Sequence, residues 1–162
     1  MADLAERLDG IRVRVRAPGA DIEAELRQRT TITLWFGESV YEFVSEPALE
    51  QALAGLARLL WAGWQRHYRA AIDETDLNIE IDDLRDSNFF SERAQVAAVG
   101  ASVDERIRVS AVGMENFSVR IEPGTVRDIT EDEFTAGAAE AATRVIEDFQ
   151  AKVDELKKRY YE

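Results

Sequence analysis

The stretch that decides the fold is SEPALEQALAGL at residues 45–56, because TEDEFTAGAAEA at residues 130–141 repeats its pattern. The two stretches lie 85 positions apart, and the same offset holds without gaps from about residue 22 to residue 71. In the first part of this stretch, apolar residues at alternate positions of one copy correspond to apolar residues of the other. This period of two is typical of half-buried strands. The pairs are Ile22, Ala24, Leu26, Ile32, Leu34 and Phe36 with Ile107, Val109, Ala111, Phe117, Val119 and Ile121.

The same offset then matches apolar residues spaced by three or four positions, which is the period of one helix face. The pairs are Leu49, Leu53, Leu56, Leu60, Trp64 and Tyr68 with Phe134, Ala138, Ala141, Val145, Phe149 and Val153. Ser45 and Thr130 are good helix N-caps, and Thr130 and Glu133 have the spacing of a capping box. Because one register survives the change of period, we predict a structural duplication.

Further strands are expected at residues 11–19 and 93–100, ahead of each matched pair. The predicted fold class is α+β, with two pseudo-symmetric strand-strand-strand-helix units. The first unit spans residues 1–76, an acidic connector with a short strand at 77–81 spans residues 77–94, and the second unit spans residues 95–162. A unit of about 80 residues is marginal alone. We therefore expect the units to join edge to edge as a pseudo-dimer, with one antiparallel sheet covered by two long helices in one compact domain.

Composition narrows the class of protein. Of the 162 residues 46% are hydrophobic and 32% are charged, as in a folded domain. The first residues, MADLAERLDG, lack a signal-peptide pattern, and no apolar run is long enough to span a membrane, so a cytoplasmic protein without a membrane partner is expected. The absence of Cys excludes disulfides and thiolate catalysis.

The net charge of −12 lies mostly in the second half of the chain. Residues 11–73 hold eight Arg and eight acidic residues, whereas residues 74–162 hold eleven basic and twenty-one acidic residues. Such a field repels phosphate backbones and favours cationic or apolar partners. Nucleic acid is therefore disfavoured as a partner.

The carboxy-terminal half, residues 105–159, resembles the YbaB/EbfC family of small bacterial nucleoid-associated proteins. The resemblance lies in a strand pair ending in Val119, Ile121 and Pro123, an acidic helix start and a long Ala-rich helix. A degenerate copy covers about residues 20–72. The resemblance implies dimerisation through sheets and helices, DNA binding in some members, and an association with type VII secretion in actinobacterial relatives. The Ala- and Arg-rich composition is itself actinobacterial in character.

An aromatic group gives the first candidate site. Trp61, Trp64 and Tyr68 share the face of the first long helix, and Trp35 comes from the strand before it. Such a stripe is either core or an exposed anchor for a partner protein, and the sequence leaves both interpretations open.

Arg12, Arg14 and Arg16 alternate with apolar residues and give the second candidate site. Three guanidinium groups on one strand face are candidates for phosphate contacts. The same pattern is typical of an edge strand protected by charge, and Asp21, Glu23 and Glu25 are expected on the same face.

No catalytic or metal-binding constellation stands out. The single His, His67, has no Ser, Cys or second His in a recognisable arrangement with it. Glu80, Asp82, Asp83 and Asp86 are acidic but lack the spacing of a calcium loop. We therefore expect no enzyme, cofactor or metal.

The sequence favours a non-enzymatic protein-binding adaptor or secretion-associated protein. A nucleoid-associated DNA-binding protein is the first alternative, and an immunity-type inhibitor of a basic toxin is the second. Whether the whole chain forms a homodimer stays open.

Overall fold

The two units have the same order of elements. The computed structural model describes residues 3–73 and 83–162. The first unit consists of α1 (Leu4–Asp9), β1 (Arg12–Arg16), β2 (Ile22–Arg27), β3 (Thr31–Phe36), α2 (Val40–Phe43) and α3 (Glu46–Asp73). The second consists of α4 (Leu84–Arg93), β4 (Ala97–Ala101), β5 (Ile107–Val112), β6 (Asn116–Ile121), α5 (Thr125–Asp128) and α6 (Glu131–Tyr161). From β1 to the start of α3, each element begins 85 residues before its counterpart, so the predicted α+β fold with a repeated unit is confirmed.

Each unit folds its strands into an antiparallel meander. The turn between the second and third strands places two consecutive residues at positive φ in both copies, Gln28 and Arg29 in the first and Gly113 and Met114 in the second. The same unusual turn conformation therefore occurs at equivalent positions of the two copies, which supports an equivalent strand register in both meanders.

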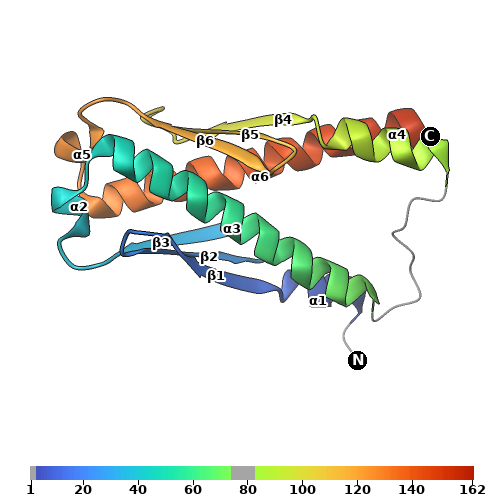
Figure 1. The fold of residues 1–162 in the computed structure, drawn as a ribbon, viewed down its shortest axis with the longest axis horizontal. Coiled ribbons are helices and arrows are strands. Elements are labelled where there is room, and N and C mark those ends of the chain that lie inside the picture. Colours follow the sequence, from blue (N-terminus) through green and yellow to red (C-terminus); the bar gives the residue numbers. More distant parts are fainter. Residues whose placement is uncertain (1–2, 74–82) are drawn as a thin grey trace.

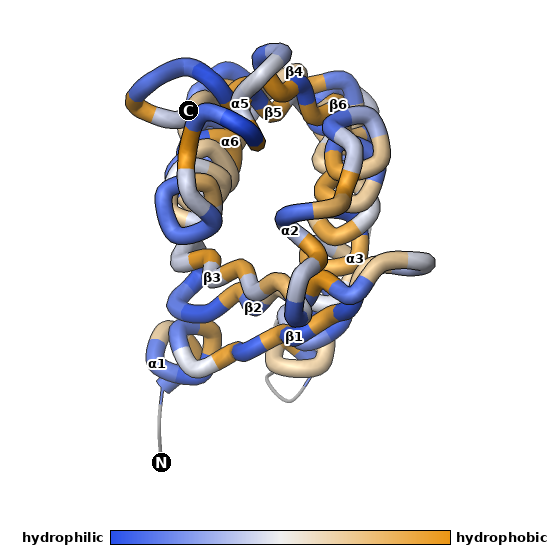
Figure 2. The backbone as a smooth tube through the Cα atoms, turned by 90° about the vertical axis from the view of Figure 1, so that its left-hand side faces the viewer, coloured by the Kyte–Doolittle hydropathy of each residue, from blue (hydrophilic) through white to orange (hydrophobic). Residues whose placement is uncertain are grey.

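The prediction of one continuous sheet is wrong, because the strands form two separate sheets of order β1-β2-β3 and β4-β5-β6. Seen end on, the sheets lie on opposite sides of the core, and α3 and α6 occupy the other two sides (Figure 2). The helices therefore do not lie side by side on one sheet face. Each long helix fills the space between an edge of one sheet and an edge of the other.

Side chains in the first turns of α3 bond to the backbone at the end of β6 and at the start of α5. The Glu50 carboxylate on α3 accepts a hydrogen bond of 2.7 Å from the backbone N–H of Ile121, the last residue of β6. Glu46, one turn earlier, accepts 3.0 Å bonds from the N–H groups of Gly124 and Val126. Glu50 thus satisfies the last N–H group of β6, and Glu46 satisfies two N–H groups at the start of α5.

Two further hydrogen bonds, one donated from each unit, join the two copies into one body. The Thr143 hydroxyl on α6 donates to the carbonyl oxygen of Thr30 at 2.7 Å, and the Tyr41 hydroxyl donates to that of Ile129 at 2.8 Å. Leu49 and Phe134, equivalent residues of the two copies, are both fully buried in the core. The two units therefore share one core.

The edge strand β4 lies unusually close to α6. The Asp148 carboxylate accepts a bond from the N–H of Val99 at 2.9 Å. Lys152 and Arg144 donate to the carbonyl oxygens of Ala97 and Ala101 at 2.8 and 2.7 Å. These three side chains occupy the hydrogen-bonding edge of β4 and remove it as a site for strand addition.

Helix α4 lies within the stretch predicted as a connector, residues 77–94, and takes the place in the second unit that α1 takes in the first. Asp83 caps it by accepting from the N–H of Asp86 at 2.8 Å. Phe89 is buried against the rings of Tyr160 and Tyr161 at the end of α6. The short strand predicted at residues 77–81 lies outside the described residues.

Candidate protein-binding groove

The structure separates the four aromatic residues that the sequence grouped together. Trp35 lies on the outer face of the first sheet, 38% exposed, with the Arg14 guanidinium 4.5 Å from its ring centre. Trp61, Trp64 and Tyr68 lie on α3, where Trp61 is buried and the other two are half-buried. Only these three form a common site.

Their rings stack along α3. Trp61 and Trp64 have ring centres 5.2 Å apart and planes inclined by 18°, and Trp64 and Tyr68 are 5.1 Å apart at 20°. Phe149 of α6 meets Trp61 edge on, at 5.9 Å. Trp61 belongs to the core, and the stack continues outward through the partly buried rings of Trp64 and Tyr68, which pack against the core.

The stack forms one wall of a groove between α3, α4 and α6, with a volume of about 380 Å³. Figure 1 shows the reason: α3 and α6 diverge toward their carboxyl ends, and α4 packs beside α6 there. Large aromatic side chains on α3 partly fill the widening space. The groove has a size and an aromatic lining typical of binding sites. Its lining consists of Trp61, Trp64, Gln65, Tyr68, Arg69, Phe90, Arg93, Phe149, Gln150, Val153, Asp154 and Lys157.

Arg93, the last residue of α4, is the most unusual charge in the groove. Its guanidinium carbon lies 5.3 Å from the ring centre of Phe149. Burial is the main cause that lowers the pKa of Arg93, because desolvation disfavours the charged form. No carboxylate forms an ion pair with it among the described residues.

Two of the tryptophans that line the groove have indole N–H groups without acceptors. Within the described part of the chain, the indole N–H groups of Trp61 and Trp64 are buried without a hydrogen-bond partner. A buried unpaired donor costs about 1–3 kcal/mol. An unpaired donor of this kind is uncommon in a folded protein.

The row of Arg12, Arg14 and Arg16 lies on the exposed outer face of the first sheet, as predicted. Each guanidinium is paired: Arg12 with Glu25 at 3.6 Å, Arg14 with Glu23 at 2.8 Å and Arg16 with Asp21 at 2.6 Å. The bond from Arg14 lowers the pKa of Glu23, so this carboxylate stays charged under mildly acidic conditions. A phosphate would have to compete with all three carboxylates for the row.

The remaining polar candidates do not converge. His67 is exposed on α3. Asp83 caps α4. Asp86 accepts a hydrogen bond from the Tyr161 hydroxyl, and this bond raises the pKa of Tyr161 to about 12. Glu80 and Asp82 lie outside the described residues. In residues 3–73 and 83–162 no group of three or more His, Asp or Glu side chains is arranged to hold a metal ion.

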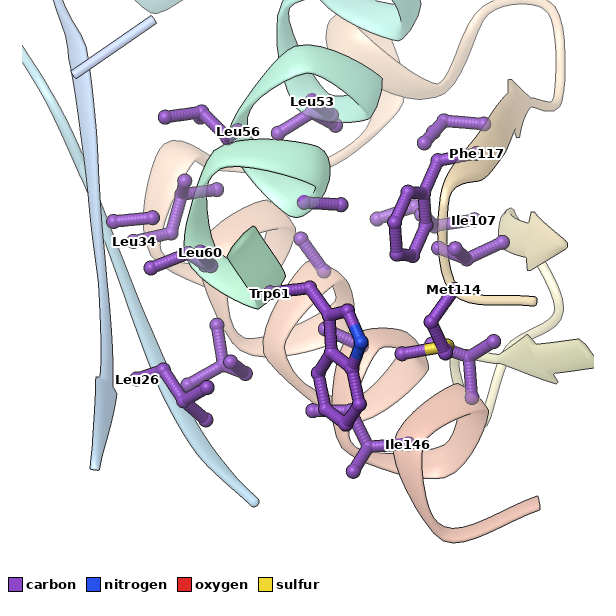
Figure 3. A pocket seen from close by; sticks show the side chains of 18 residues that line it. Leu26, Leu34, Leu53, Leu56, Leu60, Trp61, Ile107, Met114, Phe117 and Ile146 are labelled. Atoms are coloured by element: carbon purple, nitrogen blue, oxygen red, sulfur yellow. The ribbon is translucent and has the colours of Figure 1, made fainter. Parts of the chain in front are cut away.

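A second hollow lies in the core and is lined by residues of both sheets and both long helices. Its volume is about 70 Å³, and all the side chains around it are apolar, with Trp61, Met114 and Phe117 among them (Figure 3). It offers no charged group or polar side chain apart from the indole of Trp61. We regard it as a packing space where the faces of the two sheets meet.

Of the twelve groove residues, sequence reasoning named Trp61, Trp64 and Tyr68 as candidate site residues and missed the other nine, among them Phe90, Arg93 and Gln150. Phe149 was available from the repeat, because it occupies the position equivalent to Trp64. Arg93 carried no such signal, because its place in the groove depends on α4 docking against α6. Its position near the end of a polar segment is equally typical of ordinary helix termination.

Comparison with protein-family models, with curated proteins and with solved structures found no match. Within the described residues, the helices include none that is both long and apolar enough to cross a bilayer.

Proposed function

We propose that this chain is a non-enzymatic protein-binding protein, an adaptor or secretion-associated protein that holds a partner in the groove between α3, α4 and α6. The observation that carries the proposal is the aromatic stack of Trp61, Trp64 and Tyr68, which runs from the core to an open groove. Stacked aromatic residues in a partly desolvated groove are typical of the residues that dominate the energy of protein interfaces.

The charge on the first sheet supports this function over DNA binding. A DNA-binding surface needs cations that are free to contact phosphates. Arg12, Arg14 and Arg16 are each engaged with a carboxylate of the neighbouring strand or of the turn between the strands. The acidic surface that would suit a basic toxin is a property of the whole second unit, with no particular site that favours the inhibitor alternative.

The experiment begins with a photo-reactive amino acid at Gln65, which lines the groove, and at Ser110, which is exposed on the outer face of β5. Cross-linking in cells should yield a distinct adduct from position 65 and none from position 110. The captured protein is then purified, and its affinity for the unmodified chain is measured by calorimetry.

Trp64→Ala should weaken this complex at least tenfold, which corresponds to about 1.4 kcal/mol, because it interrupts the aromatic stack. The matched control is Trp35→Ala, which removes the same side chain from the outer face of the first sheet and should leave the affinity unchanged. Equal affinity of the Trp64 variant and the unmodified chain, or a loss that occurs only with the Trp35 variant, would refute the proposal.

A further inference from the structure

The groove has a charge opposite in sign to that of the protein. Its lining includes the cations Arg69, Arg93 and Lys157 and one carboxylate, Asp154. The chain as a whole carries a net charge of −12. The long-range field therefore favours cationic partners, whereas the groove itself attracts an anion.

Among the groove cations, Arg93 is the one whose charge is clearly destabilised by burial. Its guanidinium is half-buried beside Phe149, so it has lost part of its hydration without gaining a carboxylate from the described residues. Buried charges are ordinarily paired, and pairing with a planar carboxylate can be bidentate. An occupant with a carboxylate at this position would restore the missing partner.

The apolar residues of the groove determine which side chain can lie beside the carboxylate of the occupant. Trp64, Tyr68 and Val153 line the same groove as Arg93 and contribute its apolar surface. A volume of about 380 Å³ accommodates one large side chain and a short length of backbone.

We infer that the groove binds a peptide segment of a partner protein that places one carboxylate beside an aromatic or aliphatic side chain, with Arg93 pairing the carboxylate. This inference rests on the proposed protein-binding function and specifies the chemistry of the partner. The net charge of −12 on the whole chain opposes the approach of long polyanions, so a single carboxylate next to an apolar side chain is favoured over a run of acidic residues.

The three tryptophans provide the assay, because each contributes one indole N–H signal to a ¹H–¹⁵N correlation spectrum. The probe is the capped dipeptide acetyl-Phe-Glu-amide, titrated to millimolar concentrations, and the isosteric control is acetyl-Phe-Gln-amide. The Glu peptide should shift the Trp61 and Trp64 signals and leave the Trp35 signal in place. The Gln peptide should bind at least tenfold more weakly.

Arg93→Met retains an apolar stem over Phe149 and removes the charge, so it should abolish the preference for Glu over Gln. Arg93→Lys should restore part of this preference, because a point charge remains. The dispersion of the three indole signals reports that both variants are folded.

Three results would overturn the inference: equal binding of both peptides, an unchanged preference in Arg93→Met, or no shift of Trp61 and Trp64 at millimolar probe. The cross-linking experiment distinguishes this failure from that of the proposed function. A partner captured at position 65 whose affinity does not depend on Arg93 would preserve the function and reject the carboxylate chemistry.

Discussion

Gly100→Ala tests the close approach of α6 to β4. A Cβ atom at position 100 would lie 2.4 Å from the carbonyl oxygen of Ala141 and 2.4 Å from the backbone nitrogen of Val145. Both contacts are with helix backbone, so no side chain can rotate away. Ordinary contact begins at 3.4 Å, and α6 would therefore have to move by about 1 Å.

The cost of this movement follows from the bonds that α6 makes to the edge of β4. Asp148, Lys152 and Arg144 bond to the backbone of β4 at 2.9, 2.8 and 2.7 Å. An extra 1 Å takes all three outside hydrogen-bonding distance. At about 1 kcal/mol for each bond, less the small gain of Ala over Gly in a strand, the loss in the free energy of unfolding is about 2–3 kcal/mol.

The assay is urea denaturation followed by circular dichroism. With a slope of about 2 kcal/mol/M, the midpoint should fall by about 1–1.5 M. The matched control is Gly55→Ala, in helix α3, where the nearest atom to an added Cβ is Pro18 Cδ at 3.9 Å. This change should raise the stability by up to about 1 kcal/mol, because Ala is the better helix residue. An unchanged midpoint for Gly100→Ala would refute the close packing of α6 on β4.

Three further predictions concern other elements. The hydrogen bond from Lys152 is the main cause that lowers the pKa of Asp148. The charged carboxylate therefore stabilises the fold above its unfolded pKa, and this contribution is lost as the pH falls through the folded pKa. Asp148→Asn should flatten the acid side of a plot of melting temperature against pH. Gln28→Gly should raise the stability by about 1 kcal/mol in urea, because Gln28 holds a φ of 51°. Ala138→Val should fill part of the 70 Å³ core hollow and raise the thermal midpoint, with a gain of about 1 kcal/mol.

The repeat made most of the local structure predictable. Ile22 and Ile107 begin equivalent strands and are both buried, and Thr130 and Glu133 form the expected capping box. These features depend on residues near each other in sequence, where the period of apolar side chains and the capping pattern act directly.

The arrangement of the two units was not predictable in the same way. Whether two sheet edges pair depends on what competes for their backbone groups, and here Glu50 provides the competing acceptor for the last N–H of β6. A lone Glu in the first turns of a helix also has an ordinary explanation in the helix dipole. The resemblance to the YbaB/EbfC family stays a prediction.

The candidate site was predictable only in part for the same reason. Trp61, Trp64 and Tyr68 share one helix face and were found from their spacing, whereas Trp35 is separated from them by the pleat of β3, which places it outside the sheet. Arg93 joins the groove only because α4 docks on α6.

Hydrogen exchange of the purified complex, once the partner has been captured, is the most direct test of the groove as the binding surface. We predict slower amide exchange in α4 and in the last turns of α3 and α6, with exchange in β4, β5 and β6 unchanged. Slower exchange confined to the strands, with α4 unaffected, would contradict the account.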